Sequence, residues 1–184
     1  MRKTLAIIAL TVCMAHPAGA VDPLPRLLVD PSSRQAIDPS PRHRIDPSVG
    51  QTVYLPIYSH IWHGDLKRDG SPERLLVSTL VSIRNTDADY PITLRRADYY
   101  DTDGKLLHHY TERPRVIAPM ATVEYFINLT DSSGGSGANM LVHWTAEQPV
   151  SQPVIEGVHA YFRGTQALGF VTNGRVTVED GANN

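Results

Sequence analysis

Cysteine is nearly absent from this sequence, since Cys13 is the only one among 184 residues. It lies in an apolar stretch near the N-terminus, and Val12, which is not a small residue, precedes it. This neighbour argues against a lipid-anchored cysteine. The rest of the chain has no thiol, so disulfides, cysteine nucleophiles, CxxC redox pairs and thiolate metal sites are excluded there.

Long apolar runs and large excesses of one charge are also missing. The one N-terminal apolar run, residues 4–15, is too short to cross a bilayer as a stable helix, and no other run is long enough. Lys and Arg number 17 against 19 Asp and Glu, which gives a net charge of −2 at pH 7. This balance leaves no basic surface for nucleic acid or an anionic membrane. We therefore expect no membrane span and no nucleic-acid partner.

The first twenty residues have the three parts of a secretory leader. Arg2 and Lys3 form a positive start, the apolar run follows, and the small residues of Ala18-Gly19-Ala20 suit a cleavage site. The pattern predicts a signal peptide over residues 1–20. The chain is then an exported protein, periplasmic or secreted.

Residues 21–50 contain an eight-residue repeat. Asp22, Asp30, Asp38 and Asp46 each precede a proline, and arginine stands at the sixth place of the first three units. Proline at every eighth residue blocks helices and sheet ladders. The repeat predicts a disordered, Asp-Pro-rich tail. The alternative is a docking tail that uses its regularly spaced arginines.

Residues 51–178 consist of short β-rich runs separated by turn residues, with no amphipathic helix longer than two turns. A slip in the alternation at Arg95-Arg96 indicates a β-bulge, and residues 101–105 suit a hairpin turn. This spacing predicts an all-β, antiparallel immunoglobulin-like β-sandwich, with a small barrel as the alternative. Residues 179–184 are expected to be a disordered C-terminus. The expected strands are residues 53–62, 75–84, 92–100, 106–110, 122–129, 139–145, 154–162 and 168–178.

The histidines suggest a metal site. His60 and His63 point to opposite faces if residues 53–62 form a continuous strand, so they chelate one ion only if the chain turns next to Gly64. With Asp65 and His143 they would suit zinc or copper in an exported protein without thiols. The alternative is that the histidines are dispersed, and the absence of a closed-site spacing favours it.

Aromatic side chains suggest a binding face. Tyr54, Tyr58 and Trp62 share one parity of the strand predicted over residues 53–62. Aromatic residues of strands usually pack in a core or across strands. If this face is exposed, however, it would suit a glycan, peptide or protein partner.

A loop rich in glycine and serine precedes the strand expected at residues 139–145. Glycine-rich backbone can direct N–H groups toward an anion, but the known phosphate-binding patterns need a following helix, which is not expected here. A tight connection between strands is the simpler reading, and a binding loop at the rim is the alternative. The candidate loop residues are Ser133, Gly134, Gly135, Ser136, Gly137 and Asn139.

Four strings together resemble a family of exported bacterial proteins defined as a domain of unknown function. The resemblance covers about residues 51–178 and implies a bacterial, periplasmic setting, without an activity or a site. No spacing assigns catalytic roles, so the sequence favours a non-enzymatic module that binds an envelope protein or a small ligand. The alternative is a histidine-mediated zinc or copper protein. The four strings are YSHIWHG at 58–64, SIRNTD at 82–87, DYYDTDGKL at 98–106 and SGGSGAN at 133–139.

Overall fold

The computed structural model describes residues 46–181, and within them every regular element is a β-strand. The all-β class predicted from the sequence is confirmed. The predicted signal peptide and nearly all of the Asp-Pro segment lie outside the described residues. The strands are β1 (Ser48–Pro56), β2 (His60–His63), β3 (Glu73–Leu76), β4 (Ser78–Arg84), β5 (Ile92–Tyr100), β6 (Leu106–His109), β7 (Arg115–Ile117), β8 (Thr122–Ile127), β9 (Asn139–Val150), β10 (Val154–Arg163), β11 (Gln166–Asn173) and β12 (Arg175–Glu179).

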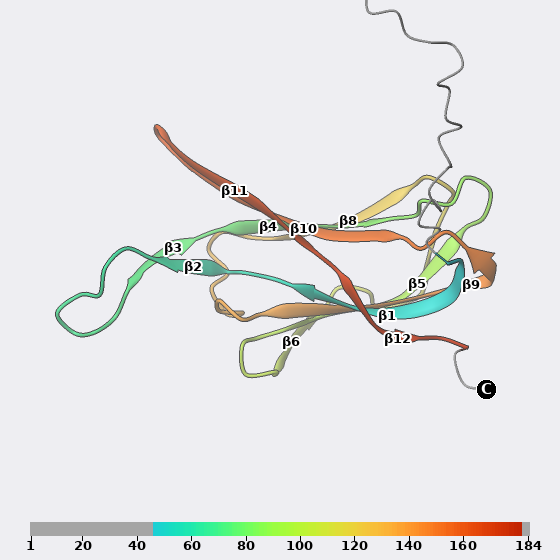
Figure 1. Ribbon diagram of the computed structural model, residues 1–184, viewed down its shortest axis with the longest axis horizontal. Coiled ribbons are helices and arrows are strands. Elements are labelled where there is room, and N and C mark those ends of the chain that lie inside the picture. Colours follow the sequence, from blue (N-terminus) through green and yellow to red (C-terminus); the bar gives the residue numbers. More distant parts are fainter. Residues whose placement is uncertain (1–45, 182–184) are drawn as a thin grey trace, which may run out of the picture. The chain divides into compact units, whose positions relative to one another are not determined.

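Two antiparallel sheets form the two layers of a sandwich-like fold (Figure 1). The first sheet has the order β12-β1-β9-β5-β6, and β7 also pairs with β5. The second sheet has the order β11-β10-β4-β8, and β2 and β3 form a separate two-stranded pair. The chain passes from the first sheet to the second through this pair.

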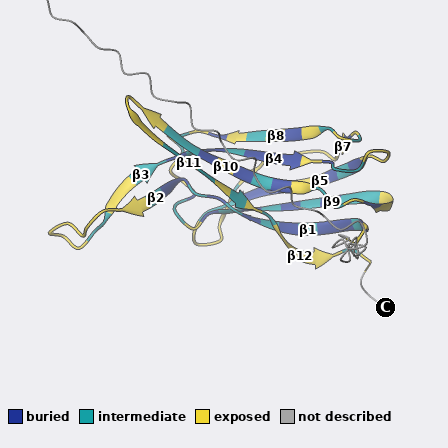
Figure 2. Cartoon of the chain, turned by 45° about the horizontal axis from the view of Figure 1, so that its top comes forward, coloured by how far each residue is buried: buried dark blue, intermediate teal, exposed yellow. Residues whose placement is uncertain are grey.

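One hydrophobic core lies between the sheets, and period-two alternation places its residues there. In β1, Val53 and Leu55 are buried while Tyr54 between them is only partly so, and β9 buries Val142 and Trp144 in the same way. From the second sheet, Ile83 packs into the same cluster. Figure 2 shows the buried residues along the strands of both sheets and the exposed ones at their outer ends.

The strand predicted over residues 53–62 is wrong, because the chain bends at residues 57–59 and divides it into β1 and β2. Two hydrogen bonds hold the bend. The Ile57 N–H donates to the Ala138 carbonyl at 2.9 Å, and the Ser59 N–H donates to the Gly135 carbonyl at 3.0 Å. These partners lie outside any strand, so β1 leaves the ladder of the first sheet here.

Two other predicted strands also divide. Residues 75–84 separate into β3 and β4 at Val77, whose N–H donates to the Ser59 carbonyl at 3.0 Å. Residues 168–178 separate at Gly174, where the chain crosses from the second sheet to the first. A side chain there would meet a Val53 methyl at 2.6 Å, so the crossing requires glycine.

The predicted bulge and hairpin turn are confirmed. The register of β5 against β9 shifts between Leu94 and Arg96. In the turn, the Asp101 carboxylate accepts the N–H groups of Asp103 at 2.9 Å and Lys105 at 2.8 Å. Gly104 takes the positive φ of 81° that this turn needs.

The ordered strands extend slightly beyond the expected domain limits. β1 begins at Ser48 rather than at residue 51, and β12 continues to Glu179. Beyond that strand, the Asp180 N–H donates to the Gly50 carbonyl at 2.9 Å. Residues 48–50 and 179–180 therefore belong to the folded domain rather than to the expected flanking segments.

Candidate functional site

Two hairpins project from the same end of the described region (Figures 1 and 2). We call β2–β3 with its connecting loop, residues 60–76, the first arm. The outer part of β10–β11, residues 161–168, is the second arm. The second arm turns at Gly164, where φ is 58°, and pairs Arg163 with Gln166 across a two-residue turn.

The two arms separate where one ladder of the second sheet ends. β4 and β10 pair continuously from Arg84 opposite Val154 to Ser78 opposite Ala160. Continuing this register by two residues would bring Leu76 opposite Phe162. Instead, residues 73–76 pair with β2. β3 thus departs from β10 and leaves a space between them.

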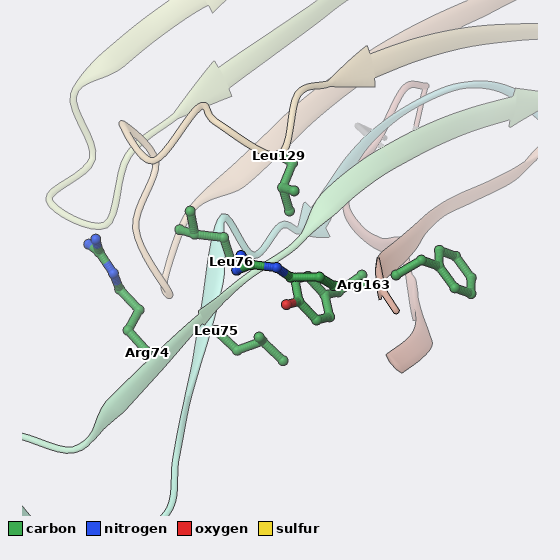
Figure 3. A pocket seen from close by; sticks show the side chains of 7 residues that line it. Arg74, Leu75, Leu76, Leu129 and Arg163 are labelled. Carbon is green, nitrogen blue, oxygen red and sulfur yellow. The ribbon is translucent and has the colours of Figure 1, made fainter. Parts of the chain in front are cut away.

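This space, which we call the wedge, has a volume of about 530 Å³ (Figure 3). Its lining is mainly apolar, and it also contains two arginines. Figure 3 shows Leu129, which follows β8, with its side chain directed toward the other side chains that line the space. Phe162 at the tip of β10 is 76% exposed. The lining residues are Arg74, Leu75, Leu76, Leu129, Tyr161, Phe162 and Arg163.

A second hollow of about 270 Å³ shares Leu75 and Tyr161 with the wedge. It lies between the facing sides of the two arms, with Ile61 and His63 from β2 and Leu168 from β11. Apolar surface therefore extends along both arms rather than forming one isolated spot. Exposed apolar surface of this kind on a folded domain usually marks a place of contact with another molecule.

The charge of the wedge is positive. Arg74 and Arg163 both line it, and no acidic side chain of residues 46–181 does. Among the described residues, neither arginine forms an ion pair within 4.0 Å. An apolar surface with two unpaired guanidinium groups suits a ligand that carries both apolar groups and carboxylates or other anions.

The predicted metal ligands do not converge. Within residues 46–181, no group of three or more His, Cys, Asp or Glu side chains is placed to hold a metal ion. His60 is buried and packs edge-on against the Trp62 ring, whereas His63 is exposed on the other face of β2 and Asp65 lies in the exposed loop. His143 binds the Asp180 carboxylate at 3.0 Å on the first sheet. The described residues therefore give the metal hypothesis no support.

Among residues 46–181, His60 has no hydrogen-bond partner on either ring nitrogen. Burial, and after it the nearby Arg74 guanidinium, lower the pKa of His60. The ring is thus kept neutral in the first arm. It acts as a packing group beneath Trp62 rather than as a charge in the wedge.

The three aromatic candidates occupy different elements. Tyr54 is half-buried on β1, and Tyr58, in the bend, packs edge-on against the rings of His159 and Phe170. Trp62 is 51% exposed on β2, and its indole N–H donates to the Ser136 hydroxyl at 3.3 Å. The single strand face predicted for them does not exist, and of the three only Trp62 presents a large surface to solvent.

Packing against neighbouring segments explains the glycines of the candidate loop. A side chain at Gly134 would meet the Tyr99 hydroxyl at 2.0 Å, and one at Gly135 would meet the Thr102 hydroxyl at 2.4 Å. The Gly137 N–H donates to the same Thr102 hydroxyl at 3.0 Å. The loop, with Ser133, Ser136 and Asn139 in it, thus packs against the hairpin turn that follows β5. Its glycines need no anion to account for them.

Sequence reasoning missed the wedge as a site. One signal was present: Leu75-Leu76-Val77 and Tyr161-Phe162 are consecutive apolar residues, which put apolar groups on both faces of their strands. In a sandwich strand, period two predicts one polar face. Such runs at strand ends indicate a second apolar surface, in addition to the one that faces the core.

The described residues form an all-β, two-sheet protein with two projecting arms and the wedge between them. The family described as "Protein of unknown function (DUF3124)" matches residues 50–177. The chain therefore belongs to the DUF3124 family. This family, an uncharacterised one, agrees with the resemblance drawn from the four strings in being a domain of unknown function, and its limits agree closely with residues 51–178.

Other comparisons add little. No curated protein matches the sequence. A solved structure described as "Crystal Structure of Thermotoga maritima 1070" is similar at 14% identity with a TM-score of 0.38, covering 68% of this chain and 92% of the other. A similarity at this level supports no inference about function. No helix in the described part of the chain is long and apolar enough to cross a membrane.

Proposed function

We propose that this protein is an exported, periplasmic binding module of immunoglobulin-like build, which holds part of an envelope protein or another ligand in the wedge without catalysing a reaction. The carrying observation is the wedge itself. A hollow of about 530 Å³ lies between two projecting arms, with a largely exposed phenylalanine at its rim. Leaving this apolar surface in water is unfavourable, and covering it on binding is the simplest use for it.

The scaffold supports a binding role. The arms are continuations of β4 and β10, which are paired on both sides within the second sheet. Arms anchored in this way hold their side chains in fixed positions, so binding requires little ordering. The export part of the proposal depends on the leader pattern of residues 1–20.

Photo-crosslinking in the producing cell tests this function. A photoreactive phenylalanine analogue replaces Phe162, and the cells are irradiated and fractionated. We expect a discrete covalent adduct in the periplasmic fraction, because a ligand in the wedge covers this side chain. The control carries the analogue in place of Val116, which is 66% exposed on β7 in the other sheet.

A further variant separates specific from chance crosslinking. Leu76→Asp places a charge in the wedge without touching the core, so it should remove the adduct formed at position 162. The proposed function is wrong if positions 162 and 116 give the same adducts. It is also wrong if the adduct survives Leu76→Asp unchanged.

A further inference from the structure

We infer that the ligand of the wedge is an extended, acidic segment of a partner protein, which adds as a strand beside β10; this inference depends on the proposed function. The first observation is that the wedge occupies a strand position. β4 pairs with β10 as far as Ser78 opposite Ala160, and with β8 as far as Thr79 opposite Ile127. Beyond these pairs, β4 no longer lies between β10 and the segment that follows β8.

If the registers of β4 with β10 and with β8 are continued past the end of β4, they show which residues border the unoccupied strand position. Val77 would lie between Tyr161 of β10 and Leu129, the second residue after β8. Both of these residues line the wedge. The chain instead turns away at Val77, whose N–H bonds to Ser59. The wedge is therefore the place that β4 would fill if it continued.

The backbone of β10 is available at this position. The Ala160 carbonyl faces β4, because it accepts the Ser78 hydroxyl at 3.1 Å. In an antiparallel strand, N–H and C=O groups two residues apart point to the same side. The N–H and C=O of Phe162 thus point into the wedge, while those of Tyr161 and Arg163 face β11. Among the described residues, no hydrogen bond outside the β10–β11 ladder involves Phe162.

An unpaired strand edge beside apolar side chains is the surface that strand addition uses. The main-chain bonds hold the incoming segment, and alternate side chains of the segment contact the pocket. Here those contacts would be with Leu76, Leu129 and Tyr161. A compact ligand would fill the volume but would leave the edge of Phe162 unpaired.

The positive charge of the wedge determines which kind of segment would bind there. Arg74 and Arg163 line the wedge without an acidic partner among the described residues. A segment with Asp or Glu beside its apolar residues would pair with them. The Asp-Pro segment of this chain is a poorer occupant. Proline lacks the N–H needed for a ladder, and the arginines of that segment offset its aspartates.

Peptide selection on the full chain tests the inference. A phage library of random twelve-residue peptides is selected on the wild-type protein and depleted on the Leu76→Asp variant. We expect enrichment of peptides in which apolar and acidic residues alternate and proline is absent. The best peptide is then synthesised with N-methyl groups on one set of alternate residues, and separately on the other set.

One N-methylated form should bind at least about tenfold more weakly, because it cannot donate to β10, and the other should bind nearly as the parent does. Arg74→Gln with Arg163→Gln should weaken the parent peptide by a similar factor, whereas Arg175→Gln, on β12, should not. Equal binding of both N-methylated forms would overturn strand addition. Selection of basic or proline-rich peptides, or of none, would also overturn it.

The two proposals fail separately. If photo-crosslinking at Phe162 yields a partner but peptide selection fails, the wedge is a binding site and strand addition is wrong. An adduct at Phe162 with residues 21–45 of the same chain would make the tail the occupant and overturn the partner-protein inference. If neither experiment gives a signal, the proposed function itself is wrong.

Discussion

Trp144→Ala is expected to lower the free energy of unfolding by about 3–5 kcal/mol, the range measured when large aromatic residues are removed from cores. Trp144 is 0% exposed and lies on β9, the central strand of the first sheet. It pairs with Gln51 of β1 on one side and Leu94 of β5 on the other. Urea unfolding of the two proteins, followed by circular dichroism, measures the difference.

Trp144→Phe is the matched control. The indole N–H has no hydrogen-bond partner in the described part of the chain, so replacing the ring by phenylalanine removes no bond there and leaves a smaller cavity. Its cost should be less than half that of the alanine variant. If Trp144→Ala costs less than about 1 kcal/mol, the core is not organised around this side chain as described.

Lowering the pH from 6.5 to 4 is expected to destabilise the protein through His159. This side chain is 0% exposed, and burial lowers its pKa to about 4. Its Nε2 accepts the Tyr58 N–H at 3.1 Å, and its Nδ1 lies 3.1 Å from the Gly157 carbonyl, to which it can donate. Its ring also stacks on Phe170 at 4.5 Å. Protonation of Nε2 would remove the acceptor of the Tyr58 N–H, whose hydrogen bond adds to the two backbone bonds that hold the bend at residues 57–59.

Acid lowers the stability because the unfolded state takes up a proton on His159 before the folded state does. Between pH 6.5 and about 4, an unfolded His159 binds a proton and the folded one does not, so acid favours unfolding. The stability that the neutral His159 contributes is fully present above pH 6.5. It is lost as the pH falls toward 4, by roughly 3 kcal/mol at most. The measurement is urea unfolding at a series of pH values.

His159→Gln provides the comparison for this acid effect. Glutamine can accept from Tyr58 and donate to Gly157 without titrating, so the variant should show a shallower loss of stability over the same pH range. Other titrating groups, including His60, are the same in both proteins, so their contributions to the pH dependence cancel when the two proteins are compared. Equal slopes for the two proteins would show that His159 does not titrate as proposed.

The strands themselves were predictable because period two is a local property. The run in β8 alternates cleanly, and in β5 the bulge at Arg95-Arg96 was visible as a slip in parity. The breaks at residues 57–59, Val77 and Gly174 were not predicted. Each depends on a distant partner: Ala138, Ser59 and Ile155, respectively. A local pattern contains no information about these partners.

The candidate site was less predictable than the fold. The wedge exists because β3 leaves β10 at Val77, so its lining comes from three segments that lie far apart in the sequence. Of the residues chosen for their chemistry, His60 and Gly134 instead serve packing. Leu76 and Phe162 carry no chemical motif, and only their position next to an unpaired strand edge makes them noteworthy.

Amide hydrogen exchange at Phe162 most directly tests whether β10 offers a free edge to a ligand. In the full chain without ligand, the Phe162 N–H should exchange at least about tenfold faster than that of Tyr161, which is bonded to β11 in the same hairpin and controls for fraying. Binding of the selected peptide should slow the exchange of the Phe162 N–H to the rate of the Tyr161 N–H. Equal protection of the two amides in the free protein would mean that the edge is already paired, which would contradict the proposed binding site.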